Sequence, residues 1–393
     1  MCPLDLKILY SAIDQAVPSA HGGSVHVTAV AEGLAGLGHE VEVFVSPGDG
    51  GRMPTGKATW IALAPPFGNR RLRLLRSRDV LARARRFKPD VVIERYYNFG
   101  GEGVRAGRQV GALVVLEVNA PIVDHPGSMK GLLDRALLVE PMRRWRDWQC
   151  RNADLIVTPS ARIVPTDVPA SKIHQTEWGA DTDRFRPGAS GPLPFSRTSG
   201  GTVAVFAGAF RAWHGAIHLV DAIRDLKSRG RTDISAVLVG DGPELPRVRE
   251  AASGVDGITL TGAVSHDHVP AILAAADVGV APFDVAAHPS LAHEFHWSPL
   301  KVFEYMASGL PVVAPRIERL ATLVADGREG LLYDGADAHG LARALEQLTA
   351  PDLRHAMGRA ARERAVSEFS WASHCRRLDE ALRAALERHR CAS

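Results

Sequence analysis

The stretch FHWSPLKVFEYMASGLPVV, residues 295–313, carries the pattern that decides the fold. A loop containing a proline leads into good helix formers at 300–307, and a glycine stop then gives way to an apolar strand at 311–313. Ser298 is a suitable N-cap, and Pro299 suits the first helical position, where no amide hydrogen bond is lost. The pattern predicts a loop–helix–strand unit of an α/β protein.

The start of this predicted helix also suggests a chemical role. A helix N-terminus after a loop offers free amides and partial positive charge to a phosphate, here around Ser298, Pro299 and Leu300. Lys301 adds a cation, and Glu304 lies about one turn further along, where a carboxylate can bind a ribose diol. The segment therefore suggests a sugar-nucleotide site, while an ordinary structural unit remains the alternative for the same residues.

Apolar runs of strand length recur on both sides of this stretch and alternate with helical segments. One series ends before a Gly/Pro-rich linker at 187–201, and a second series follows it. Such patterns indicate parallel sheets covered on both faces. We therefore predict the α/β class with two Rossmann-like, doubly wound parallel-sheet domains. The expected domains are an N-terminal one at 1–190, a C-terminal one at 200–368, and a C-terminal helix at 369–393 packing back toward the first domain.

Length and composition agree with this organisation. A chain of 393 residues is too long for one typical core, and 46% hydrophobic with 23% charged residues is typical of a soluble globular protein. The net charge of +3 gives no argument for nucleic acid as a partner. The N-terminus lacks the features of a signal peptide, and no apolar run is long enough to span a bilayer, so we expect a cytoplasmic chain. The four cysteines are scattered without metal-ligand spacing, so they are expected to be free thiols.

The order of the motifs resembles the retaining GT-B glycosyltransferases of family four, also called glycosyl transferases group 1. The wording SPLKVFEYMASGLPVVA is similar to a variant of that family. The family motif is a Glu, seven residues and a second Glu; Glu304 matches the second, and His296 stands in place of the first. The resemblance covers nearly the whole chain and implies two Rossmann-like domains facing a central cleft, in a bacterial, metal-independent enzyme.

In the first half, two places carry the resemblance. Gly22 and Gly23 lie in the loop that opens the first long helix, which in the family borders the diphosphate. Glu117 and Asn119 lie at a strand end and are expected to line the acceptor or sugar pocket. An internal salt bridge between Glu117 and Arg95 is the alternative for the same carboxylate.

In the second half, the loop after the first strand departs from the family. Aligning Gly208 with the family glycine puts Ala209 on the usual Arg position and His214 on the usual Lys position. Arg211 and Lys301 are the expected substitutes, since a leaving diphosphate needs charge compensation. His214 is expected to donate a hydrogen bond or to carry a proton at mildly acid pH.

Further matches complete the expected donor site. Gly240 and Gly242 resemble the family's Gly-x-Gly-Pro turn close to the nucleotide, and Val264 is expected to cover the base. The expected catalytic residues are Arg211, Lys301, His296, Asn119 and Glu117. The expected donor-binding residues are Gly22, Gly23, Gly208, His214, Gly240, Gly242, Val264, Ser298, Pro299, Leu300 and Glu304.

The leading functional hypothesis is a retaining glycosyltransferase that uses a nucleotide-diphosphate sugar, with UDP as the first candidate and GDP as the second. A soluble small-molecule acceptor is favoured, and neither a permanently bound cofactor nor a metal is expected. The alternatives are an epimerase or hydrolase using His296 and Glu117 as an acid/base pair, a transferase acting on lipid or polysaccharide at a membrane surface, and a non-catalytic binding protein.

Two basic stretches with apolar residues at helical spacing lie at 68–89 and 130–150. A basic amphipathic helix can lie on an anionic membrane, but a surface helix with a solvated polar face is the more common explanation. Peripheral membrane contact is therefore left open and not favoured, and the chain is expected to be a monomer or a homodimer.

Overall fold

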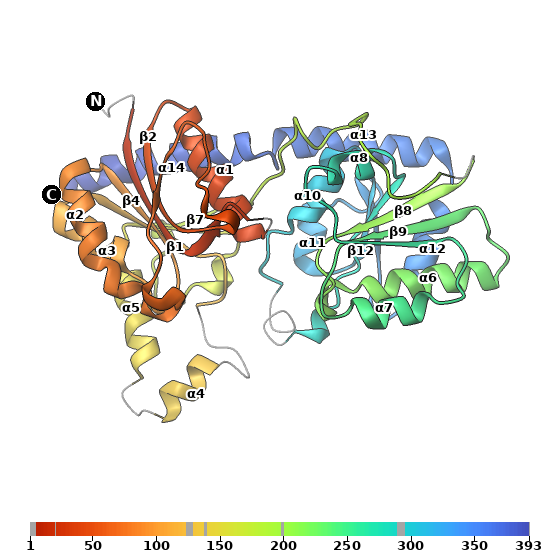
Figure 1. Ribbon diagram of the computed structural model, residues 1–393, viewed down its shortest axis with the longest axis horizontal. Coiled ribbons are helices and arrows are strands. Elements are labelled where there is room, and N and C mark those ends of the chain that lie inside the picture. Colours follow the sequence, from red (N-terminus) through yellow and green to blue (C-terminus); the bar gives the residue numbers. More distant parts are fainter. Residues whose placement is uncertain are drawn as a thin grey trace. The chain divides into compact units, whose positions relative to one another are not determined.

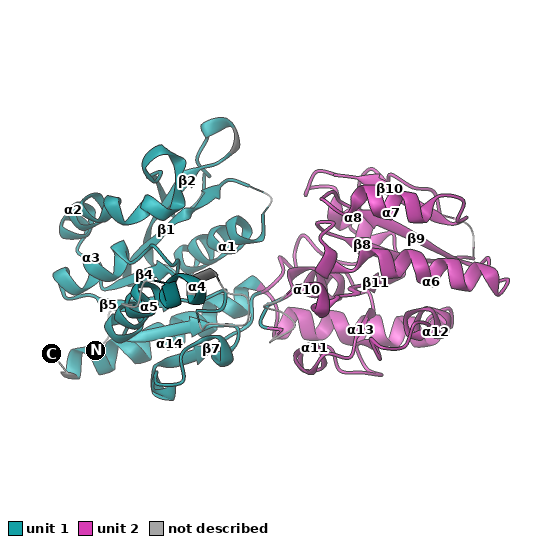
Figure 2. Ribbon diagram, turned by 90° about the horizontal axis from the view of Figure 1, so that it is seen from below, with its two compact units in different colours: residues 1–178, 296–298, 371–393 teal, residues 179–295, 299–370 magenta. Residues whose placement is uncertain are grey.

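The structure is a computed structural model that describes residues 5–19, 21–122, 129–136, 140–197, 200–288 and 295–392. It forms two compact units (Figure 2). Unit 1 contains residues 1–178, 296–298 and 371–393, and unit 2 contains residues 179–295 and 299–370. The units differ from the expected domains in two ways: the chain leaves unit 1 after residue 178, and residues 296–298 belong to unit 1.

Unit 1 is built on a seven-stranded parallel sheet with the order β3-β2-β1-β4-β5-β6-β7 (Figure 1). The order reverses between β1 and β4, as in doubly wound folds. The strands are β1 (Lys7–Val17), β2 (Glu40–Pro47), β3 (Thr59–Ala62), β4 (Val91–Arg95), β5 (Leu113–Glu117), β6 (Leu155–Thr158) and β7 (Ile173–Gln175).

Helices cover both faces of this sheet because successive strand residues point to opposite sides. Ile8 and Tyr10 of β1 pack with helices α1 and α14, whereas Leu9 of the same strand packs with helices α2 and α3. The helices of unit 1 are α1 (Gly22–Gly36), α2 (Ser77–Phe87), α3 (Glu102–Val110), α4 (Met129–Ala136), α5 (Pro141–Asn152) and α14 (Trp371–Ala392).

Unit 2 is built on a six-stranded parallel sheet with the order β10-β9-β8-β11-β12-β13. Its strands are β8 (Thr202–Ala207), β9 (Ile234–Val239), β10 (Ile258–Gly262), β11 (Val278–Val280), β12 (Val312–Pro315) and β13 (Gly330–Tyr333). Its helices are α6 (Ala216–Ser228), α7 (Leu245–Ala252), α8 (Val269–Ala274), α10 (Leu300–Ala307), α11 (Glu318–Leu323), α12 (Gly340–Gln347) and α13 (Pro351–Ser367). Two Rossmann-like parallel sheets confirm the predicted fold class, and the cleft expected between them stays a prediction.

Helix α10 fixes the geometry of the carboxyl ends of the strands in unit 2. It spans the residues that the sequence pattern predicts, Leu300–Ala307. Tyr305 packs on β11 where Gly279 leaves room: a Cβ at that glycine would lie 2.5 Å from the tyrosine ring. The Tyr305 hydroxyl also accepts a hydrogen bond of 2.8 Å from the amide of Ala207, the last residue of β8. The helix is thereby held over the neighbouring strands β8 and β11.

Throughout the described ranges, no helix has both the length and the apolar character that crossing a bilayer requires.

Candidate functional site

The carboxyl ends of β8 and β11 mark the point where the strand order of unit 2 reverses. Open α/β sheets bind their ligands at such a switch point. Gly208 follows β8 with a φ of +144°, and a Cβ placed on it would lie 3.0 Å from the Nζ atom of Lys301. Lys301 therefore reaches the switch point from α10, and the glycine provides the space for its tip.

The ammonium group of Lys301 is buried and, within the part of the chain that the structure describes, has no hydrogen-bond partner. Its Nζ lies 4.2 Å from the ring centroid of Phe206 and 5.4 Å from that of Phe283. Burial lowers the pKa of Lys301 to about 7, and the nearby Glu304 carboxylate only partly opposes this. A buried cation with no hydrogen bond is costly, and an anionic ligand such as a phosphate would satisfy it.

His214 lies in the short 3-10 turn η6 (Ala212–His214) that follows β8. Its Nδ1 donates a hydrogen bond of 2.5 Å to the carbonyl of Ala209. Burial, together with the cations of Lys301 and Arg211, lowers the pKa of His214 to about 3. The expectation that His214 carries a proton at mildly acid pH is therefore wrong for this structure, because desolvation and two neighbouring cations oppose a further charge.

Arg211 is exposed, and its Cζ lies 5.9 Å from the ring centroid of Trp213. The Trp213 ring lies edge-on to His214 at 5.9 Å, and His214 lies edge-on to Phe283 at 6.1 Å. Because the Lys301 Nζ is 5.4 Å from the Phe283 ring, a series of ring contacts connects Arg211 with Lys301.

Gly240 and Gly242 allow the loop after β9 to pack closely against the loop after β8. Their φ angles are +130° and +153°, and a Cβ would lie 2.0 Å from the Gly208 carbonyl oxygen and 2.6 Å from the Phe210 carbonyl oxygen, respectively. The amide of Phe210 also donates to the carbonyl of Asp241 at 2.8 Å. The close approach that these glycines permit is therefore between the loops after β8 and β9.

Glu304 lies on α10 with 16% of its side chain exposed, and its Oε1 is 3.8 Å from Nε2 of His266. The His266 carbonyl accepts a hydrogen bond of 2.6 Å from Arg184, and its ring lies edge-on to Phe185 at 5.8 Å. This positions an imidazole beside the carboxylate expected to bind ribose. His266 was not among the residues predicted from the sequence, although it lies two residues after Val264, which is half-buried.

The start of α10 differs from the prediction. Pro299 is the N-cap, without a side-chain capping bond, so Ser298 is not the cap and Pro299 is not the first helical residue. The Ser298 hydroxyl instead donates to the Glu177 carboxylate at 2.7 Å and accepts from the Trp178 amide at 2.8 Å. Because proline has no amide hydrogen, the first amide that α10 offers is that of Leu300.

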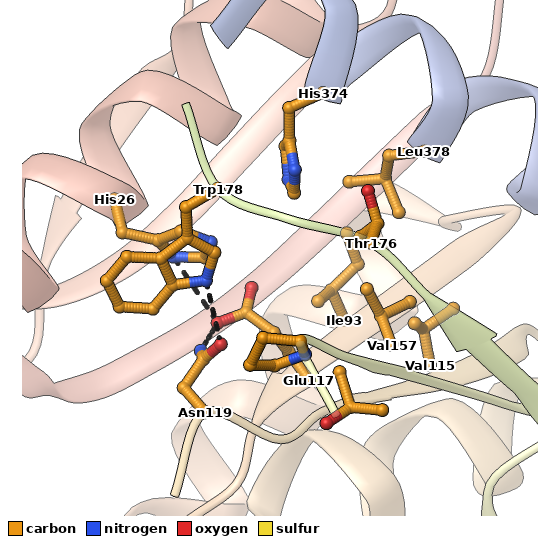
Figure 3. Close-up of a pocket in the computed structure, with 12 residues that line it drawn as sticks. His26, Ile93, Val115, Glu117, Asn119, Val157, Thr176, Trp178, His374 and Leu378 are labelled. Atoms are coloured by element: carbon orange, nitrogen blue, oxygen red, sulfur yellow. Dashed lines mark hydrogen bonds and ion pairs between the residues drawn. The ribbon is translucent and has the colours of Figure 1, made fainter. Parts of the chain in front are cut away.

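In unit 1, the structure shows the salt bridge between Arg95 and Glu117 that was the alternative for Glu117. Figure 3 shows Glu117 beside Asn119 and Trp178. Its carboxylate accepts hydrogen bonds of 2.7 Å from Arg95 and 2.6 Å from the Tyr10 hydroxyl, and a third from the side-chain Nδ2 of Asn119. The side-chain Oδ1 of Asn119 accepts a hydrogen bond of 3.1 Å from the indole nitrogen of Trp178. Both expected pocket residues are thus engaged by protein groups.

A small cavity of about 10 Å³ lies beside Glu117, with room for about one water molecule and not for a sugar. Burial lowers the pKa of His26 well below its usual value and that of His374 to about 4, so both imidazoles are neutral at pH 7. The lining residues are His26, Ile93, Val115, Glu117, Asn119, Val157, Thr158, Pro159, Thr176, Trp178, His374 and Leu378.

The contacts described for His296 and Gly23 are packing contacts within unit 1. His296 is only 1% exposed and lies edge-on to Trp297 at 5.8 Å. Helix α1 begins at Gly22, and a Cβ on Gly23 would lie 2.1 Å from the Gln15 Oε1 atom. Gly23 therefore lets the side chain of Gln15 lie against the first turn of α1.

A buried charge cluster lies at the switch point of unit 1, at the carboxyl ends of β1 and β4. Arg73, which is fully buried, forms ion pairs with Asp14 at 2.7 Å, Glu94 at 3.0 Å and Glu102 at 2.6 Å. Glu94 also accepts hydrogen bonds from the amides of Gly101 and Gly103. Burial first, and Glu102 second, raise the pKa of Glu94 from 4.5 to about 8, against the effect of Arg73.

Replacing Glu94 with glutamine is expected to flatten the pH dependence of the stability of unit 1. Because the folded pKa of Glu94 is raised, its contribution to stability is full below pH 4.5 and is lost as the pH rises toward 8. The Glu94→Gln variant should therefore gain stability relative to the parent at pH 9. Urea unfolding at pH 5, 7 and 9 checks this, with Glu40→Gln at the surface as control. Parallel pH profiles of parent and Glu94→Gln would contradict the assignment.

Among the described residues, no group of three or more His, Cys, Asp or Glu side chains has a geometry that could hold a metal ion.

Two family models match this chain, one in each unit. The model described as Glycosyltransferase Family 4 matches residues 20–184, and the model described as Glycosyl transferases group 1 matches residues 201–350. The chain belongs to glycosyltransferase family four. The resemblance drawn from the sequence is confirmed.

Curated relatives of this family member match over part of their length. A GDP-mannose-dependent alpha-(1-6)-phosphatidylinositol monomannoside mannosyltransferase of Mycobacterium tuberculosis is 30% identical over 223 residues, covering 55% of this chain and 57% of the relative. A D-inositol 3-phosphate glycosyltransferase of Corynebacterium kroppenstedtii is 33% identical over 218 residues, covering 51% of this chain and 46% of the relative. The chain thus spans about half the length of these proteins.

Solved structures share the fold along nearly the whole chain. A sucrose-phosphate synthase from Thermosynechococcus elongatus superposes with a TM-score of 0.73 at 20% identity, covering 96% of this chain and 98% of the other. The Anabaena protein HepE, solved in complex with UDP and glucose, gives a TM-score of 0.68 at 16% identity, covering 96% and 99%. Together with the family membership, these similarities confirm the predicted GT-B fold.

Proposed function

We propose that this chain is a retaining glycosyltransferase that moves a sugar from a nucleotide-diphosphate sugar to an acceptor. The observation that carries the proposal is the buried ammonium of Lys301, which has no described hydrogen-bond partner and lies at the switch point of unit 2. A diphosphate is the ligand that such a group fits best, because it brings charge and hydrogen-bond acceptors together. Donor sugars of this kind carry that group as their leaving group.

In this proposal the protein orients the donor and stabilises the negative charge that develops on the leaving diphosphate. Lys301 contacts the phosphate from its place beside the rings of Phe206 and Phe283, and Arg211 approaches from the loop after β8. These side chains, with the first amides of α10, supply the positive charge without a metal. The leaving phosphate itself helps to deprotonate the acceptor on the same face of the sugar, which retains the anomeric configuration.

Glu304 and His266 hold the nucleoside in this scheme. The carboxylate accepts hydrogen bonds from the ribose diol, and the imidazole, 3.8 Å away, fixes its orientation. UDP is the first candidate for the nucleotide and GDP the second. The complex of HepE with UDP supports the first, and the GDP-mannose named for the mycobacterial relative supports the second.

A soluble small-molecule acceptor remains the favoured class, and the D-inositol 3-phosphate named for the Corynebacterium relative supports it. The phosphatidylinositol monomannoside named for the mycobacterial relative supports a lipid acceptor as the second candidate. The epimerase or hydrolase alternative is disfavoured, because Glu117, its proposed base, is held by three protein donors.

A thermal-shift panel of UDP, GDP and their sugar conjugates tests the proposal. We expect one nucleotide diphosphate to raise the melting temperature, and its sugar conjugate to support transfer to an acceptor with retained configuration. Incubation of the donor alone separates the alternatives, since epimerised sugar or rapid release of free sugar would indicate an epimerase or a hydrolase. The absence of any shift with all diphosphates would overturn the proposed donor site.

Glu304→Gln is expected to weaken the binding of the best nucleotide by about tenfold or more, because each hydrogen bond to a charged group contributes about 1.5–3 kcal/mol. Titration calorimetry of parent and variant with that nucleotide measures the change. Glu250→Gln, at an exposed site on α7, is the matched control and should bind as the parent does. An unchanged affinity of Glu304→Gln would remove Glu304 from the site.

A further inference from the structure

Two large apolar side chains after β3 are exposed to solvent, although the pattern of the basic stretch at 68–89 suggests buried apolar residues. Phe67 is 99% exposed and Leu75 is 67% exposed. In contrast, Val80 and Phe87 of α2 are buried in the core of unit 1, as the spacing predicts. The apolar residues of α2 thus pack on the core, whereas Phe67 and Leu75 of the segment before it are exposed.

This segment, residues 66–78, consists of the 3-10 turns η2 (Pro66–Gly68) and η3 (Arg70–Arg76) and the start of α2. Phe67 has a φ of +54° and a ψ of 21°, a left-handed conformation that is costly for an aromatic residue. Its exposed ring also gains nothing from packing. The fold thus holds an aromatic side chain in solvent at the expense of both backbone strain and lost burial.

The surroundings of the two apolar side chains are strongly basic. Arg70, Arg71 and Arg78 are exposed, and none of them forms an ion pair with a described residue. No Asp or Glu occurs between residues 57 and 78 of the sequence. Asp79 follows directly and pairs with Arg76, so the segment combines two exposed apolar side chains with the exposed Arg70 and Arg71, which pair with no described residue, and with Arg78.

The segment is fixed to unit 1 and is not a loose loop. Arg73, in the middle of η3, is fully buried in the charge cluster with Asp14, Glu94 and Glu102. Arg76 donates a hydrogen bond of 2.8 Å to the carbonyl of Ala64. The segment is thus anchored from within and presents Phe67 and Leu75 outward on a defined backbone.

We propose that the segment 66–78 docks on the surface of an anionic lipid bilayer. Phe67 and Leu75 enter the boundary between headgroups and acyl chains, and Arg70, Arg71 and Arg78 lie beside the lipid phosphates. Two side chains are too small an apolar surface for a stable protein interface, which needs about 800 Å² from each partner. An anionic bilayer matches both the exposed apolar groups and the excess of arginine. This inference does not rest on the proposed transferase activity.

Flotation of the full chain with lipid vesicles tests the proposal. The chain should bind vesicles of phosphatidylcholine mixed with phosphatidylglycerol and not vesicles of phosphatidylcholine alone, and high salt should weaken the binding. Phe67→Asn should lower the partition coefficient by about tenfold, because the ring no longer enters the bilayer. Arg70→Gln and Arg71→Gln should each lower it by about fivefold.

The variants are chosen so that a loss of vesicle binding cannot be explained by a loss of folding. Asparagine tolerates the left-handed conformation better than phenylalanine, so Phe67→Asn should melt at the same temperature as the parent or higher. Leu353→Asn, at a 37% exposed site on α13 outside both basic stretches, is the matched control and should float as the parent does.

Three results would each overturn the proposal. The first is no preference of the parent for anionic vesicles, and the second is unchanged flotation of Phe67→Asn. The third is self-association of the parent in sedimentation velocity without lipid that Phe67→Asn abolishes, because the segment would then bind a second copy of the chain.

Discussion

Lys301→Met is expected to lower kcat for sugar transfer by about 100- to 1,000-fold, the usual effect of removing one donor that stabilises charge in a transition state. The Nζ of Lys301 is buried at the end of β8 and lies within 5.4 Å of two aromatic rings, so its charge acts in a weakly screening environment. Methionine keeps most of the side-chain volume and removes only the ammonium. Steady-state kinetics with the identified donor measures the change.

The same variant should leave the fold at least as stable as the parent. The pKa of Lys301 is lowered from 10.5 to about 7, so the folded chain binds fewer protons than the unfolded chain between these values. The stability of the parent therefore rises with pH from 7 to 10.5, and below pH 7 the cost of the buried charge is fully present. Methionine removes this cost, and the variant should be the more stable protein at pH 6.

Nucleotide binding gives a second readout that a merely structural lysine would not change. A diphosphate favours the ammonium form, so the affinity of the parent should fall by up to about tenfold per pH unit above pH 7. The affinity of Lys301→Met should stay flat over the same range. Lys227→Met, at a half-buried lysine of α6, is the control and should retain both the rate and the pH profile. A normal kcat in Lys301→Met would rule out charge compensation by this residue.

Local patterns were sufficient to predict much of the fold. The helix formers at 300–307, bounded by a proline and by Gly309 with a φ of +77°, define α10 without help from distant residues. The continuous apolar runs likewise predict two parallel sheets, because a strand buried on both faces needs no polar alternation.

The roles of individual polar side chains depended on partners far away in the sequence. Ser298 looks like a helix cap locally, yet its hydroxyl bonds to Glu177, which is 121 residues away. Glu117 looks like a pocket carboxylate, and only the folded chain shows that Arg95 and Tyr10 engage it. A sequence gives the residue type at a strand end, whereas tertiary contacts decide whether its charge is available to a ligand.

Lys301 differs from these residues, because its charge was predicted to be available to a ligand and the described structure gives it no hydrogen-bond partner. The position of Lys301 next to the helix start is visible in the sequence. Its burial beside Phe206 and Phe283 follows from the pairing of β8 with β11, in which Ala204 pairs with Val278, 74 positions further along the chain. Pairing of distant strands is the step that single-sequence patterns specify least.

Arg73→Met is expected to destabilise unit 1 by about 3–5 kcal/mol, the usual cost of leaving buried charges without their partner. Arg73 is the guanidinium that Asp14, Glu94 and Glu102 share, and its side chain is fully buried. Methionine fills similar space but leaves the carboxylates facing one another. Hydrogen exchange read by mass spectrometry should show faster opening of peptides from β1 and β4, while peptides from unit 2 keep the protection of the parent.

The pH dependence distinguishes lost charge compensation from lost packing. In Arg73→Met the carboxylates should take up protons more readily in the folded state, so their pKa values rise and stability is lost as the pH increases. The defect should therefore shrink toward pH 5 and grow toward pH 9. Arg143→Met removes an arginine of α5 that pairs with Glu140, and both side chains are about half exposed, so it should cost only about 0–1 kcal/mol at any of these pH values. An Arg73→Met defect that is equally large at pH 5 and pH 9 would mean that the guanidinium acts through its volume. A defect no larger than that of Arg143→Met would mean that the three carboxylates are already neutral in the parent.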